Sequence, residues 1–304
     1  MKQILRITIG LTISCLIAAA VMGSVFTVTD KAKKQNEHLN VQQTMLGLLG
    51  YTKAKPAPSD LKLYSIYRYI IEDGKEKYLG YMTPVERGKD EGYELLLITL
   101  EGKFAGRHEV HISPEKAIEE PDREKALKAV LKPPKKFSYA DATIIANLGD
   151  KHLAYLLPAE FPGFKTFITV MLALDPTFKI LGLEITEHEE DPGLGAEIEQ
   201  EYFKNQFKGK TFKKVKELEV IKEPLPEEYR RYLETKKWGK GIFSEEEITS
   251  IRSKYKGQDI YALTGATISS KAVTDGVKGM IRRFAYRVEI LDGVIAAQKV
   301  PVAF

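Results

Sequence analysis

The sequence predicts an α+β fold in which a single N-terminal transmembrane helix precedes an antiparallel sheet with helices packed against it. Three observations support this prediction: an uncharged apolar run near the N-terminus, strand-like runs joined by short turns, and helical spacing of apolar residues near the C-terminus. The chain has 304 residues, of which 43% are hydrophobic and 29% charged, so its composition suits a globular protein with a buried core.

The N-terminal apolar run covers residues 7–29 and contains no charged residue. At about 1.5 Å per residue, a helix of this length spans the about 30 Å hydrocarbon core of a bilayer. We expect residues 1–30 to form a retained transmembrane anchor, because the run is longer than the apolar core of a signal peptide. A cleaved signal peptide is the alternative, since Ala18, Ala19 and Ala20 are small. Basic residues lie on both sides of the run, so charge does not settle its orientation.

Residues 31–60 are predicted to be a stalk and linker. Residues 30–43 are polar and charged, as in a helix that leaves the membrane. Residues 53–59 read Lys-Ala-Lys-Pro-Ala-Pro-Ser, which is typical of a linker or turn.

Residues 61–150 are predicted to be an N-terminal α+β region. Residues 61–81 contain two strand-like runs around Asp73-Gly74, which indicates a hairpin. Residues 92–100 and 104–112 are expected to be strands joined by a turn. Residues 114–131 are expected to form a helix that Pro133-Pro134 ends.

Residues 151–304 are predicted to be a second domain. A glycine-aromatic, strand, turn, strand pattern at residues 163–185 resembles residues 92–110, which favours either a degenerate repeat or two ordinary hairpins. A helix is expected at residues 197–207 and a final strand at residues 288–300. The stretch around Trp238 is interpreted as a surface loop.

The most informative stretch is residues 263–271, Leu-Thr-Gly-Ala-Thr-Ile-Ser-Ser-Lys, which precedes a helical pattern. A helix N-terminus attracts phosphate through its unpaired N–H groups and dipole, and Gly265 lets the backbone approach a ligand. Thr267 is placed to meet a phosphate ester. The alternative is an ordinary hydroxyl cap on a surface helix.

This stretch resembles the flavinylation motif of FMN-binding domains, Ser/Thr-Gly-Ala-Thr-x-Thr/Ser-Ser. Such domains occur in the G subunit of the Rnf electron-transport complex and the C subunit of the sodium-translocating NADH:quinone reductase. The resemblance implies that Thr267 carries FMN through a phosphodiester bond, and that a flavin transferase attaches it. Thr264, Gly265, Ala266 and Ser269 are the candidates for positioning the phosphate and ribityl chain.

The chain departs from the motif at one position. The family usually has Asp three residues before the first Ser/Thr, and Tyr261 stands there in this sequence, with Asp259 as the nearest acid.

A second stretch supports the resemblance. Residues 187–195, Glu-His-Glu-Glu-Asp-Pro-Gly-Leu-Gly, are similar to the family signature His-x-Glu-Thr-Pro-Gly-Leu-Gly, with Asp191 in place of Thr. The resemblance assigns residues 151–304 to an FMN-binding domain and brings this turn near the flavin. The candidate cofactor-binding residues of the stretch are Glu187, His188, Pro192, Gly193, Leu194 and Gly195.

Other kinds of site find no support in the sequence. The single cysteine, Cys15, excludes disulfides within the chain and a Cys-ligated iron–sulfur cluster. No second His or Cys lies at ligand spacing from His188, so no metal site is expected. Nucleotide-binding glycine motifs and a Gly-x-Ser-x-Gly elbow are missing, and no catalytic residue is assigned. The net charge of +4 is scattered and does not indicate nucleic-acid binding.

The function that the resemblance implies is electron relay through covalent FMN in an Rnf-type ion-translocating ferredoxin:NAD oxidoreductase. The chain would be a subunit rather than a stand-alone enzyme, with membrane and iron–sulfur subunits as partners and most of its residues on the extracytoplasmic side. One alternative is a subunit of a sodium-translocating quinone reductase or another extracytoplasmic respiratory relay. An alternative of another class is a single-pass scaffold or binding protein without redox function.

Overall fold

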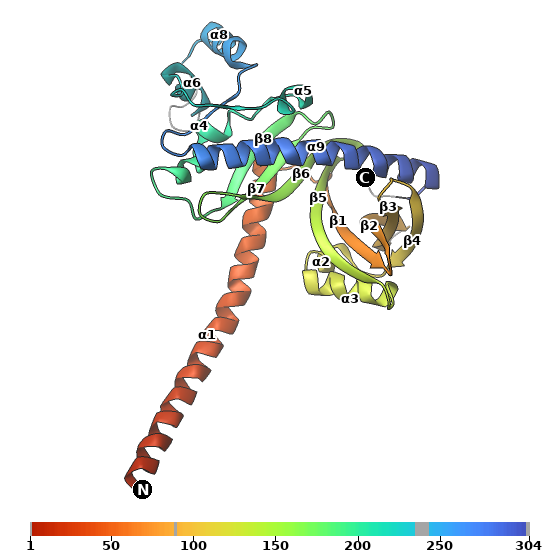
Figure 1. Ribbon diagram of the computed structural model, residues 1–304, viewed down its shortest axis with the longest axis vertical. Coiled ribbons are helices and arrows are strands. Elements are labelled where there is room, and N and C mark those ends of the chain that lie inside the picture. Colours follow the sequence, from red (N-terminus) through yellow and green to blue (C-terminus); the bar gives the residue numbers. More distant parts are fainter. Residues whose placement is uncertain (1, 88–89, 235–242, 302–304) are drawn as a thin grey trace. The chain divides into compact units, whose positions relative to one another are not determined.

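The computed structural model describes residues 2–87, 90–234 and 243–301 (Figure 1). The chain divides into two compact units, Met1–Gly47 and Leu48–Phe304. The Trp238 stretch lies outside the described residues.

The first unit is a single helix, α1, which spans Lys2–Leu48. Its segment Gln3–Phe26 has a mean hydropathy of 2.2, and it is long and apolar enough to cross a membrane. Among the residues that the structure describes, it is the one helix with these properties. The chain therefore has one candidate membrane span, and the polar stretch expected to be a helical stalk continues the same helix.

The second unit is built on an eight-stranded sheet with the strand order β4-β3-β2-β1-β5-β6-β7-β8. The strands are β1 Leu61–Asp73, β2 Glu76–Arg87, β3 Asp90–Thr99, β4 Phe104–Val110, β5 Lys136–Leu148, β6 Lys151–Pro162, β7 Phe167–Leu174 and β8 Ile180–Glu187. Every pair in this sheet is antiparallel. The sheet consists of two four-stranded meanders joined by the β1–β5 pair, so the antiparallel fold class and the predicted hairpins are confirmed.

The two resembling hairpins, β3–β4 and β7–β8, occupy the two edges of this sheet. An internal repeat would place them so, and two ordinary meanders would as well. The repeat stays a prediction, as do the domain limits of 61–150 and 151–304.

Strand β3 of the first meander is buried on both faces, and its successive side chains point to opposite sides of the sheet. Leu96 and Ile98 of β3 belong to the larger core, which includes α9 (Thr267–Gln298). Leu95 and Leu97 face the opposite side, where α2 (Pro114–Ala117) and α3 (Glu120–Val130) pack. Figure 1 shows α9 lying across the strands and α2 and α3 beside β1. The near-continuous apolar run in β3 follows from this double burial.

The remaining described elements are short and connect β8 to α9. They are η1 Gly195–Glu199, α4 Glu201–Lys204, α5 Phe212–Val215, β9 Val220–Ile221, α6 Glu227–Leu233, α8 Glu245–Tyr255 and β10 Ile260–Tyr261. The parallel pair of β9 and β10 leads directly into the first residues of the motif before α9.

Three sequence predictions need correction. The strand expected at residues 288–300 is wrong, because α9 continues to Gln298 and the buried residues Phe284, Leu291 and Val294 keep helical spacing. The helix expected at residues 197–207 is instead η1, one turn of α4 and irregular chain. The helix expected at residues 114–131 is divided into α2 and α3, and the second helix begins at Glu120 with Pro121 in its first turn.

Candidate functional site

The start of α9 leaves Thr267 at an open helix N-terminus. Gly265 has φ +75°, a conformation that favours glycine, and the chain then enters the helix with Ala266 as N-cap. A methyl side chain accepts no hydrogen bond, so the predicted alternative of a hydroxyl cap is wrong at this helix. Thr267 is the first helical residue and is half-buried. The N–H groups of such a first turn have no partner within the helix.

The two serines of the motif point the other way, into the protein. Ser270 is fully buried, and its Oγ accepts from the Leu263 N–H at 2.9 Å and donates to the Ala266 carbonyl at 2.9 Å. These bonds hold the turn at residues 263–266 from its buried side. The motif is thus divided into inward serines and outward residues, with Thr264 and Gly265 exposed.

Glu190 joins three segments around this turn. It is only 5% exposed, and its Oε1 accepts from the backbone N–H groups of Phe164 at 2.8 Å and Lys165 at 3.2 Å. Its Oε2 accepts from the Oγ of Ser269. Sequence reasoning missed Glu190 as a site residue, although it aligns with the glutamate of the His-x-Glu signature.

The turn after Glu190 contacts the α9 turn directly. A Cβ atom at Gly195 would lie 2.6 Å from Glu190 Oε2 and 2.9 Å from Ser269 Oγ, so this position requires glycine. Leu194 reaches the other motif, since its Cδ2 is 3.0 Å from the position of a Cβ at Gly265. The two stretches that resemble the family signatures, 187–195 and 264–270, are therefore adjacent.

Of the other predicted residues in this stretch, His188 bonds within its own loop and three are exposed. His188 Nδ1 accepts from the Glu190 N–H at 3.1 Å, and its Nε2 lies 2.9 Å from Glu199 Oε1. Glu187 is exposed at the end of β8, opposite Thr169 of β7. Pro192 and Gly193 are exposed, and Gly193 has φ +73°. No group of acids, histidines or cysteines in the described part of the chain is arranged to hold a metal ion.

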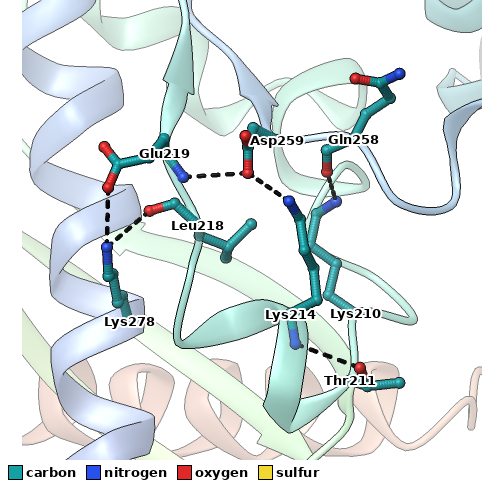
Figure 2. A network of polar contacts seen from close by, with 8 residues as sticks. All are labelled: Lys210, Thr211, Lys214, Leu218, Glu219, Gln258, Asp259 and Lys278. Carbon is teal, nitrogen blue, oxygen red and sulfur yellow. Dashed lines mark hydrogen bonds and ion pairs between the residues drawn. The ribbon is translucent and has the colours of Figure 1, made fainter.

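Asp259, the acid nearest to the motif, is held in a polar network that supports β10 (Figure 2). Its Oδ1 accepts from Lys214 Nζ at 2.7 Å and from the Glu219 N–H at 3.2 Å. Lys210 Nζ donates to the Gln258 carbonyl, and Lys278 Nζ of α9 donates to the Leu218 carbonyl at 3.0 Å. Figure 2 shows Lys278 on one side of the Leu218–Glu219 segment and Asp259, Lys214 and Lys210 on the other.

Lys210 is the electrostatically unusual member of this network. Burial, with a smaller effect of the nearby Lys214 charge, lowers its pKa to about 8, and Asp259 opposes the shift. The network holds the backbone that leads into the motif, and Asp259 contributes to this through its bonds to Lys214 and Glu219.

Tyr261 is held by its backbone. Its N–H donates to Gln206 Oε1 at 2.7 Å and its carbonyl accepts from Gln206 Nε2 at 3.2 Å. Its ring lies edge-on to Tyr229, with centroids 6.4 Å apart, and packs with the small cluster of α6 and α8. The position at which the family has an acid is here part of an aromatic contact.

The residues present suit a phosphate-bearing flavin. The open N-terminus of α9 and the Thr267 hydroxyl suit the phosphate, and the position of Gly193 borders open space. Exposed Leu194 and Ile268 flank the turn, as does Phe164, whose N–H is bound by Glu190. These apolar side chains offer contact area for an aromatic ring system.

Comparison with known proteins agrees with this geometry. Residues 163–282 match the FMN-binding domain family. This range contains both stretches and the first half of α9, so the resemblance read from the two motifs is confirmed, and FMN is the cofactor that the domain implies.

Two relatives are G subunits of ion-translocating complexes. Over 138 residues the chain is 31% identical to the G subunit of the proton-translocating ferredoxin:NAD(+) oxidoreductase complex of Clostridium ljungdahlii, covering 45% of this chain and 57% of that protein. Over 137 residues it is 31% identical to the G subunit of the ion-translocating oxidoreductase complex of Salmonella typhi, covering 44% of this chain and 52% of that protein. The chain therefore spans a little over half the length of these relatives.

Two solved structures are distantly similar. NqrC of Shewanella oneidensis has a TM-score of 0.33 at 19% identity, covering 50% of this chain and 59% of that one. The C subunit of the Na(+)-translocating NADH-quinone reductase of Parabacteroides distasonis has a TM-score of 0.33 at 17% identity, covering 64% of this chain and 74% of that one.

Proposed function

We propose that this chain is a membrane-anchored flavoprotein subunit that carries FMN covalently on Thr267 and relays electrons within an Rnf-type ion-translocating ferredoxin:NAD oxidoreductase complex. The observation that carries the proposal is the division of the motif. Ser269 and Ser270 are buried and hydrogen-bonded, whereas the hydroxyl of Thr267 lies at the open N-terminus of α9.

The residues around Thr267 have separate tasks in this proposal. The Thr267 hydroxyl would give up its proton and bond through Oγ1 to the FMN phosphate, and the first-turn N–H groups and dipole of α9 would stabilise the remaining phosphate charge. Glu190 and Ser270 hold the turn in place from inside. Bound FMN would supply the capacity to take up and release one or two electrons. The exposed side chains of Leu194 and Ile268 would offer it apolar contact.

One observation favours the Rnf-type complex over the alternatives. The relatives at 31% identity are both G subunits of ion-translocating oxidoreductase complexes. The candidate span Gln3–Phe26 suits a membrane-attached protein of any of the kinds considered. Partners would be membrane subunits and iron–sulfur subunits, and a flavin transferase would attach the cofactor. The domain after α1 would face the extracytoplasmic side.

The test is in-gel flavin fluorescence of the denatured full-length protein, produced together with a flavin transferase. Wild type is expected to give a fluorescent band, and Thr267→Ala is expected to lose it. Thr249→Ala is the matched control, because it removes an exposed threonine hydroxyl outside both motif stretches and is expected to keep the band. A Thr267→Ala protein that keeps its fluorescent band contradicts the assignment.

A further inference from the structure

A cavity of about 410 Å³ lies between the sheet and the C-terminal half of α9. Small-molecule sites have volumes of about 300–1,000 Å³. The cavity is remote from the FMN motif, because Arg287 in its wall follows Thr267 by 20 residues (287 − 267) and thus lies about 30 Å further along the helix. It is therefore a separate site.

The middle of the cavity is apolar and partly aromatic. Ile66 and Ile145 line it from the sheet, and Leu291 lines it from α9. Tyr155 and Phe284 contribute two rings whose centroids are 5.0 Å apart at an interplanar angle of 73°. Such a wall suits an aromatic ligand, since rings pack favourably edge-on or offset against other rings.

One end of the cavity carries a surplus of positive charge. Arg68 Nε donates to Asp141 Oδ1 at 2.9 Å, and Arg287 Nη1 donates to Asp141 Oδ2 at 2.7 Å. Two guanidinium groups thus share one carboxylate, which leaves a net charge of +1. Each guanidinium has five N–H donors, and these contacts use only part of that number. This end suits a second carboxylate, supplied by a ligand.

The other end holds a buried nitrogen that needs a partner. It lies apart from the first end, because Arg68 pairs with Asp141 of β5 whereas His152 pairs with Asn147, six residues further along that strand. His152 Nε2 is buried, and within residues 2–87, 90–234 and 243–301 it has no hydrogen-bond partner. The imidazole ring packs edge-on to Tyr155, with centroids 4.3 Å apart, which fixes its plane. An unpaired buried polar atom is unfavourable, and a ligand group at this place would give it a hydrogen-bond partner.

Asp292 restricts which group suits this end. It also lines the cavity, and burial raises its pKa while it lowers the pKa of His152. A hydroxyl suits both residues, because it donates one hydrogen bond and accepts another. A carboxylate would be repelled by Asp292.

We propose that this cavity binds a two-ring aromatic carboxylate that carries a hydroxyl at its far end. The carboxylate binds Arg68 and Arg287, the rings lie against Tyr155 and Phe284, and the hydroxyl binds His152 Nε2. The site does not depend on flavin at Thr267, so the two proposals stand or fall separately.

The test is isothermal titration calorimetry of the full-length protein in lipid nanodiscs, with empty nanodiscs subtracted. The probe is 4′-hydroxybiphenyl-4-carboxylate. Biphenyl-4-carboxylate lacks the hydroxyl, 4-hydroxybiphenyl lacks the carboxylate, and biphenyl-4,4′-dicarboxylate carries a second charge. Each is expected to bind the wild-type protein about tenfold more weakly than the probe, the loss that one strong hydrogen bond accounts for.

Variants locate the two ends. His152→Phe is expected to lower the affinity for the probe about tenfold and to leave the affinity for biphenyl-4-carboxylate unchanged. His111→Phe, at an exposed position, should change neither affinity. Arg287→Met is expected to lower the affinity for both of these ligands, whereas Arg282→Met, on the exposed side of α9, should leave both affinities unchanged.

Three results would overturn the proposal. The first is heat no greater than that of empty nanodiscs. The second is equal wild-type affinity for the probe and biphenyl-4-carboxylate, a comparison that needs no variant to fold. The third is a His152→Phe protein that binds both ligands as wild type does.

Discussion

The two ends of α9 are attached to the sheet by different kinds of contact. At the N-terminal end, short polar side chains and glycine turns bring loops together, as in the contact of Ser269 with Glu190 and the buried Ser270. At the C-terminal end, Arg287 reaches Asp141 with a long side chain, and apolar residues leave a cavity between helix and sheet. Close backbone approach gives the first end a fixed turn with Thr267 at the start of the helix, whereas long side chains leave a cavity at the second end.

The difference also explains which end can be found from the sequence. The N-terminal end is encoded in two short stretches whose glycines and hydroxyls mark it locally. The C-terminal end joins Arg68, Asp141, His152 and Arg287, which are far apart in the chain and have no common motif.

The largest effect is expected at the N-terminal end, from Glu190→Ala. The change leaves the N–H groups of Phe164 and Lys165 and the hydroxyl of Ser269 without their partner. At about 1–3 kcal/mol for each such group, we expect the free energy of unfolding to fall by about 4 kcal/mol, measured by urea unfolding followed by circular dichroism. Covalent flavin is expected to fall with it.

The matched control is Glu189→Ala, which removes the exposed neighbouring carboxylate and should leave stability and flavin content unchanged. Equal behaviour of the two variants would show that Glu190 does not hold the three segments together.

The role of Glu190 marks the limit of what the sequence predicts. The motif placed Thr267 beside a helix N-terminus, the Asp73-Gly74 turn signal placed the β1–β2 hairpin, and an apolar run placed β3, because these signals are local. Glu190 sits within a run of acids that reads as a solvated loop, and its burial depends on β6, β7 and α9 meeting there. The prediction of a final strand at residues 288–300 was wrong because its secondary structure also depends on distant contacts. The β-branched residues Val288, Val294 and Ile295 are typical of a strand, but here they belong to α9, which packs on the sheet.

At the C-terminal end, Asp141→Asn is expected to lower the free energy of unfolding by about 2–3 kcal/mol, since Arg68 and Arg287 lose their shared anion in a partly buried place. Burial opposes the charged form of Asp141, but the hydrogen bond from Arg68 and the charge of Arg287 hold its pKa below the usual value. A lowered folded-state pKa means that the stabilisation is present above about pH 4 and is lost as the pH falls through the folded-state value.

Urea unfolding from pH 7 to pH 2 measures this effect. The difference between wild type and Asp141→Asn should shrink below about pH 4. Asp150→Asn, in an exposed turn, is the control and should follow wild type. A difference that is the same at every pH would contradict the ionic account of this end.

The smallest effect is expected from Lys210, which supports the backbone before the motif. Burial lowers its folded-state pKa to about 8, and an unfolded lysine has a pKa of about 10.4. Between these values the unfolded state binds more protons, so this group makes stability rise with pH. We expect wild type to gain about 1–2 kcal/mol relative to Lys210→Met between pH 8 and pH 10.

Urea unfolding at pH 7, 8, 9 and 10 measures this gain, with exposed Lys213→Met as the control. If Lys210→Met keeps the pH slope of wild type, Lys210 is not the group that titrates.

The most direct test of the central claim is mass spectrometry of the peptide that contains residues 263–271, isolated from wild-type protein produced with a flavin transferase. We expect a peptide heavier by one esterified FMN, with fragment ions that place the added mass on Thr267. An unmodified peptide, or FMN on Thr264 or a serine of the motif, would contradict the assignment of the open end of α9 as the flavin attachment site.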